Sequence, residues 1–173
     1  MRFSDLNLSK EVLQAIDDMG FESPSEVQEG TIPLILEGRD VLAQAQTGTG
    51  KTASFGIPMI EGIEDKSHDL QGIVLVPTRE LARQVSDELK KLAKYKKFIN
   101  IVPIYGGADM SKQLRDLKKG ADIVVGTPGR VMDHMKRKTI VLDDLKFLTL
   151  DEADEMFDMG FRDDMKTIIE KTN

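Results

Sequence analysis

A glycine-rich segment that ends in lysine and threonine is the part of this sequence best suited to chemistry. It comprises Ala45, Gln46, Thr47, Gly48, Thr49, Gly50, Lys51 and Thr52. Glycines let backbone N–H groups turn toward phosphate oxygens, and the helical pattern that follows from residue 53 adds the positive potential of a helix N-terminus. In such a P-loop the lysine reaches the β- and γ-phosphates, and the threonine hydroxyl can bind Mg²⁺. The segment therefore predicts a site for a nucleoside triphosphate with magnesium.

Two acids that follow an apolar run form a second candidate for catalysis. Residues 147–150 lead directly into Asp151 and Glu152, with Ala153 and Asp154 after them. Asp151 is suited to hold Mg²⁺ through water, and Glu152 to polarise a water that attacks the γ-phosphate in line. On its own the acidic segment is equally well a helix start, where negative charge is favoured. The P-loop in the same chain favours the catalytic interpretation.

The elements that position these residues are short apolar runs rich in β-branched residues. They span residues 40–43, 73–76, 99–104, 123–125 and 147–150, and segments with helical spacing lie between them. Strands that alternate with helices predict an α/β fold with a mostly parallel central sheet and helices on both faces. Ligands of such sheets bind beyond the carboxyl ends of the strands, so the residues after each run are the candidates for function.

Composition narrows the class of protein. The chain has 173 residues, 40% of them hydrophobic and 31% charged, which fits one globular domain. It has no cysteine, which excludes disulfides, zinc-thiolate sites and a cysteine nucleophile. The net charge of -6 argues against binding nucleic acid by bulk positive charge, so any such contact must be local. With no signal-like or membrane-spanning run, we expect a soluble, cytoplasmic protein without a membrane partner.

Further motifs follow the predicted strands in a recognisable order. They are the segment Pro77 to Ala82, the pair Gly106 and Gly107, and the segment Thr127 to Arg130. Together with the P-loop and the Asp-Glu-Ala-Asp segment, they make the chain resemble the first domain of the DEAD-box RNA helicases over essentially its whole length. This resemblance implies a RecA-like P-loop NTPase domain over residues 1–173, with ATP and Mg²⁺ as cofactors and RNA as partner.

Residues 1–30 resemble the Q motif of this family. The resemblance implies that Gln28 reads the adenine edge, that Ser25 stands where threonine is more usual, and that Phe3 is the upstream aromatic. A carboxamide can pair with adenine N6 and N7 in a bidentate way that the O6 acceptor of guanine refuses. Taken alone, Gln28 would be interpreted as an ordinary helix-surface residue and Phe3 as a staple to the core, and only their place in the pattern assigns them to the site.

The resemblance also implies contacts to the RNA sugar-phosphate backbone. Their residues are Pro77, Thr78, Arg79, Glu80, Gly106, Gly107, Thr127, Pro128, Gly129 and Arg130. The two arginines can fork onto phosphate, and the glycines permit close backbone approach. Thr127 and Pro128 suit the cap and first turn of a helix. Such contacts position a strand without reading its sequence.

In the family, the chain continues to a strand that ends in a Ser-Ala-Thr motif and then to a second RecA-like domain. We therefore expect this domain to be incomplete at its C-terminal end and inactive in unwinding by itself. The family's additional strand lies between the P-loop strand and the strand before Asp151. Its absence predicts unpaired backbone groups along both.

The leading functional hypothesis is an ATP-dependent RNA helicase. One alternative is a P-loop ATPase that acts on DNA or protein, because phosphate-binding loops are common to many families. Another is a non-catalytic module that binds nucleotide or RNA. Among the remaining residues, we expect His68 and His134 to lie on the surface, and Met156, Met159 and Met165 to serve in packing.

Overall fold

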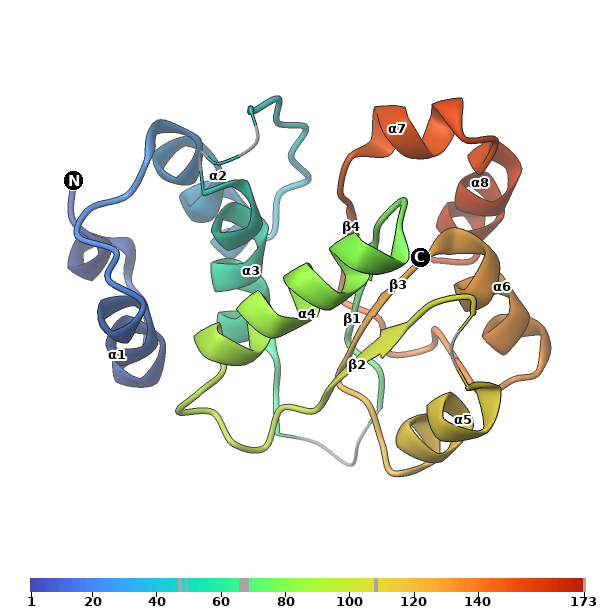
Figure 1. Cartoon of the computed structure of the whole chain (residues 1–173). Coiled ribbons are helices and arrows are strands. Elements are labelled where there is room, and N and C mark those ends of the chain that lie inside the picture. Colours follow the sequence, from blue (N-terminus) through green and yellow to red (C-terminus); the bar gives the residue numbers. More distant parts are fainter. Residues whose placement is uncertain (47, 49, 66–68, 108, 173) are drawn as a thin grey trace. The chain divides into compact units, whose positions relative to one another are not determined.

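The computed structural model describes residues 1–46, 48, 50–65, 69–107 and 109–172. The chain divides into two compact units (Figure 1). Unit 1 comprises Met1–Glu64 and Asp87–Phe98, and unit 2 comprises Asp65–Ser86 and Ile99–Asn173. Helix α4 (Arg79–Leu92) therefore begins in unit 2 and ends in unit 1.

Unit 1 is helical among its described residues. Its elements are η1 (Phe3–Leu6), α1 (Lys10–Asp18), α2 (Glu26–Leu36), α3 (Lys51–Gly62) and the last turns of α4. The Ser9 hydroxyl caps α1 by accepting a hydrogen bond from the Val12 amide at 3.3 Å. Helix α3 packs closely on α4: a Cβ at Gly56 would lie 2.8 Å from Leu89 Cδ2. Glycine at that position lets the two helices approach.

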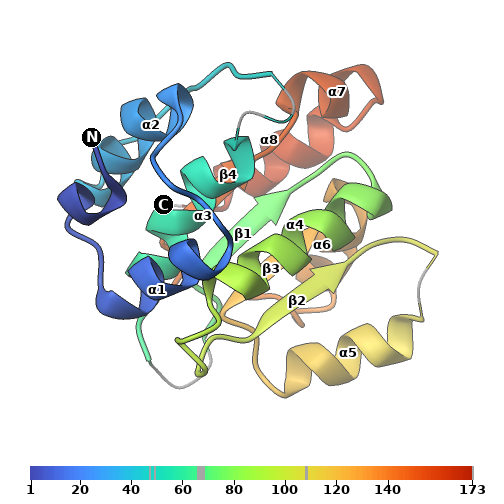
Figure 2. The same ribbon diagram turned by 60° about the vertical axis from the view of Figure 1, so that its left-hand side comes forward.

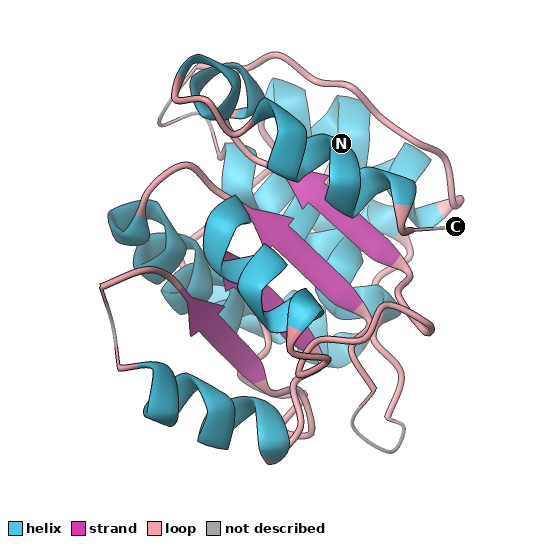
Figure 3. Ribbon diagram, turned by 90° about the vertical axis from the view of Figure 1, so that its right-hand side faces the viewer, coloured by secondary structure: helices cyan, strands magenta, loops and turns pink. Residues whose placement is uncertain are grey.

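Unit 2 holds a four-stranded sheet. Its elements are β1 (Gly72–Leu75), the start of α4, β2 (Ile101–Ile104), α5 (Met110–Lys118), β3 (Ile123–Gly126), α6 (Pro128–Lys136), β4 (Phe147–Leu150), α7 (Ala153–Asp158) and α8 (Arg162–Glu170). The strand order is β2-β3-β1-β4, and all paired strands are parallel, as the arrows in Figure 3 show. The predicted parallel α/β fold is confirmed.

Helices cover both faces of this sheet. Figure 2 shows the start of α4 on one side and α6 and α8 on the other. Ile73 and Leu75 of β1 belong to the core cluster with Val131 of α6 and Ile168 of α8, whereas the intervening Val74 is also completely buried. Burial on both faces explains why these strands read as unbroken apolar runs.

One of the five predicted strands, at residues 40–43, is wrong. Residues 40–43 form no strand, and the side chain of Leu42 is fully exposed at 101% of its reference area. A strand requires hydrogen bonds to a neighbouring strand. Among the described residues, no strand pairs with residues 40–46. An apolar, β-branched sequence is therefore left as extended chain.

Strand β4 lies at the edge of the sheet. It pairs with β1 on one side only, and its four residues are all half-buried, whereas those of β1 and β3 are all buried. The backbone groups on its outer side are thus without a ladder partner among the described strands.

Candidate functional site

The P-loop leads into the N-terminus of α3 in unit 1. Gly50 is the residue before the helix and has a φ of 78°, and Lys51 and Thr52 form its first two positions. Gly48 also has a positive φ, 87°. Gln46 is exposed, and the predicted phosphate contacts Thr47 and Thr49 lie outside the described residues. The first amides of α3 are the donors that a phosphate would meet, and positive φ values at Gly48 and Gly50 explain the need for glycine.

Gln28 of α2 contacts this loop directly. Its Nε2 donates to the Gly50 carbonyl at 3.1 Å, and its Oε1 accepts from the Ser25 amide at 3.0 Å. A Cβ on Gly50 would lie 2.3 Å from Gln28 Nε2, so a side chain at this position would displace the carboxamide. Gln28 is 3% exposed, which makes the alternative of a helix-surface residue wrong. With these two bonds made, the carboxamide has a second N–H and a second lone pair that could meet a ligand.

Of the other two predicted Q-motif residues, Ser25 bonds to Gln28, whereas Phe3 packs on another aromatic ring. The Ser25 hydroxyl caps α2 by accepting from the Gln28 amide, so Ser25 and Gln28 form a capping box. Phe3 is 5% exposed and stacks on Phe21 with ring centroids 6.4 Å apart. Phe3 thus packs in the core of unit 1, as the alternative interpretation expected.

In unit 2, the carboxyl ends of all four strands lie at one level. Leu75 is in register with Gly126 and Leu150, and Gly126 is in register with Ile104. The segments that follow these strands contain the three predicted RNA motifs and the Asp-Glu-Ala-Asp segment. The sheet therefore brings all four to the same edge.

Asp151 and Glu152 begin the connection from β4 to α7. Asp151 is 5% exposed, and its amide extends the ladder by donating to the Leu75 carbonyl at 2.9 Å. Glu152 has a φ of 56° and a ψ of 51°, a left-handed conformation that non-glycine residues seldom adopt. A side-chain hydrogen bond shared with Glu152 raises the pKa of Glu155, and slight desolvation and the neighbouring acids act in the same direction. Such a conformation at an acid beside a sheet edge is typical of a functional position.

The two predicted phosphate-binding arginines lie around the glycine pair. A Cβ on Gly107 would lie 3.2 Å from Arg79 Nη1, and a Cβ on Gly106 would lie 3.9 Å from Arg130 Nη2. Arg79 also lies over the Tyr105 ring, with Cζ 5.7 Å from the ring centroid. Segments separated by up to 51 residues thus place two cations beside an exposed loop. This cluster of Arg79, Arg130, Gly106 and Gly107 is called the arginine–glycine loop below.

The other residues of these motifs lie at the starts of α4 and α6. The Thr78 hydroxyl accepts from the Leu81 amide at 3.1 Å at the start of α4, and Pro77 is buried while Glu80 is exposed. Pro128 is the first residue of α6, as predicted, but the Thr127 side chain makes no capping hydrogen bond. Gly129 is half-buried in the first turn of α6.

Two residues behind this edge, His134 and Gln113, were misassigned or missed from the sequence. His134 is completely buried, so its predicted surface position is wrong; His68 lies outside the described residues. Burial lowers the pKa of His134, and the charges of Arg130 and Arg137 act in the same direction. Gln113 is 4% exposed and contacts both His134 and the Tyr105 carbonyl. A polar residue on the same helix face as the partly buried Leu117, four positions along α5, was the available signal.

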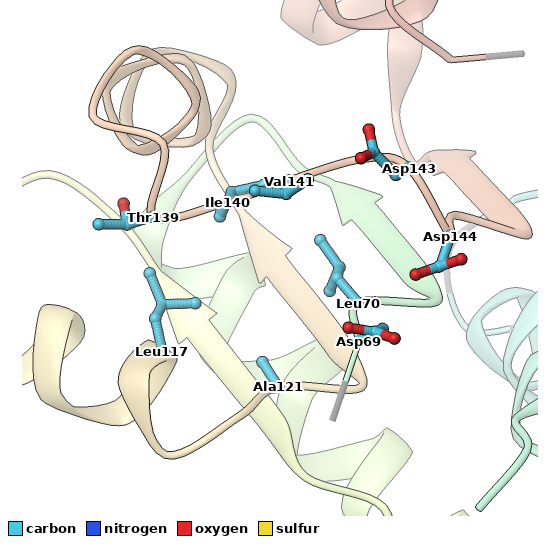
Figure 4. A pocket seen from close by; sticks show the side chains of 9 residues that line it. All are labelled: Asp69, Leu70, Leu117, Ala121, Thr139, Ile140, Val141, Asp143 and Asp144. Atoms are coloured by element: carbon cyan, nitrogen blue, oxygen red, sulfur yellow. The ribbon is translucent and has the colours of Figure 1, made fainter. Parts of the chain in front are cut away.

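A pocket of about 280 Å³ lies elsewhere in unit 2 (Figure 4). It is formed where the strands begin, next to β1, β3 and β4. Its apolar wall and its acidic rim come from Leu70, Leu117 and Ala121, and from Asp69, Asp143 and Asp144. The pocket is therefore at the edge of the sheet opposite the arginine–glycine loop and forms no part of the candidate site.

Neither a multidentate metal cluster nor a membrane span is found in the part of the chain that the structure describes. No three His, Cys, Asp or Glu side chains there are grouped so that they could hold a metal ion. None of the helices there has the length and hydrophobicity required to cross a membrane.

Of the three methionines predicted to serve in packing, Met156 and Met165 are buried, but Met159 is half exposed at 50%.

Comparison with known proteins agrees with this arrangement. The chain is 53% identical over 170 residues to the ATP-dependent RNA helicase CshA of Listeria monocytogenes, and this match covers 98% of the chain and 32% of the relative. It is 53% identical over 167 residues to the CshA of Bacillus subtilis, covering 34% of that protein. A solved DEAD box protein from Methanococcus jannaschii superimposes with a TM-score of 0.94 at 48% identity, over all of this chain and 47% of that one. The chain thus spans about a third of the length of the curated relatives it matches.

The parallel sheet, the P-loop sequence and the acids after β4 define a RecA-like α/β protein of the P-loop class. The DEAD/DEAH box helicase family matches residues 25–173. The chain belongs to this family.

Proposed function

We propose that residues 1–173 are the ATP-binding RecA-like domain of an ATP-dependent RNA helicase, with its Q motif in residues 1–30. The enzyme would couple ATP hydrolysis to the unwinding of RNA duplexes or the remodelling of RNA–protein complexes. The arginine–glycine loop is the observation that carries the proposal. Two guanidinium groups beside an exposed glycine turn suit a sugar-phosphate backbone, and the loop shares its sheet edge with Asp151 and Glu152. Both CshA relatives are named ATP-dependent RNA helicases.

ATP would be bound by the P-loop and the Q motif. Backbone amides of the loop and the Lys51 ammonium would hold the phosphates, and Gln28 would pair with the adenine edge. Thr52 and Asp151 would hold Mg²⁺, which neutralises charge on the phosphates when it is bound. A hydroxyl and a carboxylate are oxygen ligands of the kind Mg²⁺ prefers, and magnesium at nucleotide sites needs few protein ligands. Glu152 would accept the proton of the attacking water.

RNA would contact the loops that follow β1, β2 and β3. Its proposed contacts are the ten residues of the three motifs: Pro77, Thr78, Arg79, Glu80, Gly106, Gly107, Thr127, Pro128, Gly129 and Arg130. A second RecA-like domain would complete the γ-phosphate site and the RNA groove. We place the protein in the cytoplasm, a proposal supported by the RNA substrate in the names of its relatives.

The test of this function is the dependence of ATP hydrolysis on nucleic acid. In the full-length protein, single-stranded RNA should raise kcat severalfold, and DNA of the same sequence should not. Arg130→Ala should raise the half-saturating RNA concentration about tenfold, because a charge-assisted contact to phosphate is lost. Arg115 is exposed in the last turn of α5, and Arg115→Ala is the matched control. It should change the half-saturating RNA concentration less than twofold.

Equal stimulation by RNA and DNA would reject RNA as the specific substrate and would favour a P-loop ATPase of another kind. Hydrolysis that does not respond to any nucleic acid would reject the proposed function altogether.

Adenine recognition by Gln28 can be tested separately. Gln28→Ala should weaken ATP more than GTP by about 1–3 kcal/mol, because only the adenine edge matches the carboxamide. Both nucleotides should also lose some affinity, since the bond to the Gly50 carbonyl positions the P-loop for either. Titration of fluorescent analogues of both nucleotides measures the difference.

Gln14→Ala is the matched control, because Gln14 is an exposed glutamine of α1 whose Nε2 donates to Asp18 Oδ1 at 2.9 Å. It should leave both affinities unchanged. If Gln28→Ala weakens ATP and GTP equally, Gln28 supports the loop but does not read the base.

A further inference from the structure

A buried carboxamide joins two segments of the candidate RNA surface from behind. Gln113 of α5 is 4% exposed, and its Nε2 donates to the Tyr105 carbonyl at 2.9 Å. Its Oε1 lies 3.3 Å from Nε2 of His134 in α6. A carbonyl can only accept, so the amide nitrogen faces Tyr105 and the amide oxygen is left to accept from the histidine N–H. Every polar atom of the carboxamide side chain thus has a partner.

His134 is held in turn. It is completely buried, and its Nδ1 lies 2.8 Å from the Thr139 hydroxyl oxygen. This second contact fixes the plane of the ring, so Nε2 faces Gln113 rather than another partner. The link from Thr139 through His134 and Gln113 to Tyr105 is continuous. Buried polar chains of this kind specify one arrangement of the segments they join, because a broken bond leaves a desolvated group.

Two members of this link, Tyr105 and His134, connect it to the arginines of the arginine–glycine loop. Tyr105 immediately precedes Gly106, and its ring lies against the Arg79 guanidinium. His134 stands one helical turn after Arg130 on α6. Gly107 has a φ of 80°, and a glycine pair has little conformational preference of its own. The shape of the loop must therefore come from its neighbours, and the Tyr105 carbonyl is the anchored point next to it.

We infer that Gln113, oriented by His134, is a positioning residue for RNA binding. It fixes the Tyr105 carbonyl and so holds the Gly106–Gly107 turn and the two arginines at the spacing that a sugar-phosphate backbone requires. Neither residue touches RNA. The inference rests on the proposed function and adds to it a buried determinant of RNA affinity that lies outside the surface motifs.

The test is Gln113→Met in the full-length protein, since methionine keeps the length of the side chain and removes both hydrogen-bonding groups. The RNA concentration that gives half-maximal ATPase stimulation should rise about tenfold, the effect of losing one buried hydrogen bond with its orientation. The kcat at saturating RNA and the KM for ATP should stay within twofold. His134→Phe, which keeps a ring and leaves Gln113 in place, should give a smaller rise of about threefold.

Leu117→Ala is the matched control, one turn further along α5 and packed on the core cluster without contact to the Tyr105 carbonyl. It should lower the melting temperature and leave the half-saturating RNA concentration unchanged. An unchanged RNA concentration in Gln113→Met, or in His134→Phe if the first variant does not fold, would overturn the inference. So would a parallel rise in the KM for ATP, which indicates general damage. Absence of RNA stimulation in the unmodified protein would instead reject the proposed function.

Discussion

Replacing Glu152 by glutamine should lower the kcat of ATP hydrolysis by at least about 100-fold, the usual effect of removing a general base. The KM for ATP should change little, because the amide keeps the shape of the side chain but cannot accept a proton. Glutamine also fits the left-handed backbone at this position no worse than glutamate does. Steady-state hydrolysis at saturating RNA in the full-length protein measures both constants.

Glu155→Gln provides a matched control for this prediction. Glu155 lies three residues later on α7 and shares a hydrogen bond with Glu152, but it would not contact the attacking water. Its kcat should stay within a few-fold of the unmodified enzyme. A Glu152→Gln variant that turns over at a similar rate would show that the proton goes elsewhere.

Lys51→Ala should weaken ATP binding by about ten- to a hundredfold. The ammonium at the first position of α3 would make a charge-assisted contact to the β- and γ-phosphates, and such contacts contribute about 1.5–3 kcal/mol. Titration with a fluorescent ATP analogue measures the loss. Adenosine binding should be unaffected, because that ligand has no phosphate for the lysine to hold.

Lys94→Ala removes the same charge from unit 1 without altering the P-loop. Lys94 pairs with Asp18 at 2.9 Å on the surface, and surface pairs contribute little to stability. ATP affinity should stay as it was. Two results would show that the lysine does not act on the phosphates. One is a folded Lys51→Ala variant that binds ATP as tightly as the unmodified protein, and the other is a loss of adenosine affinity as large as the loss of ATP affinity.

The sheet of unit 2 could be predicted from sequence because each of its strands is a short, unbroken apolar run, fully buried in β1 and β3 and half-buried in β4. Four apolar runs became β1 to β4, and the predicted bounds of β4 are the observed ones. The run at residues 40–43 has the same composition but forms no strand. Hydrophobic patterning indicates where a chain prefers to be extended and buried, whereas a strand also requires a partner. A single run does not specify that partner.

The contacts within the candidate site depended on long-range packing. Motif order indicated that Gln28 belongs to the nucleotide site, but its bond to the Gly50 carbonyl joins residues 22 apart. Sequence spacing offered no indication of that contact. His134 shows the limit more clearly, because a histidine among charged neighbours is typical of a surface helix. Its burial results from the docking of α6 on α5 through Gln113, which only the folded chain displays.

Glu152 places a cost on the fold at the position where catalysis is proposed. A left-handed residue with a side chain is less stable than a right-handed one by about 1–2 kcal/mol, and glycine avoids most of this penalty. Substitution by glycine at this position would relieve the backbone but remove the carboxylate. The residue therefore embodies a trade-off between stability and activity. Adaptation of this domain to higher temperature has to leave that penalty in place and gain stability elsewhere in the chain.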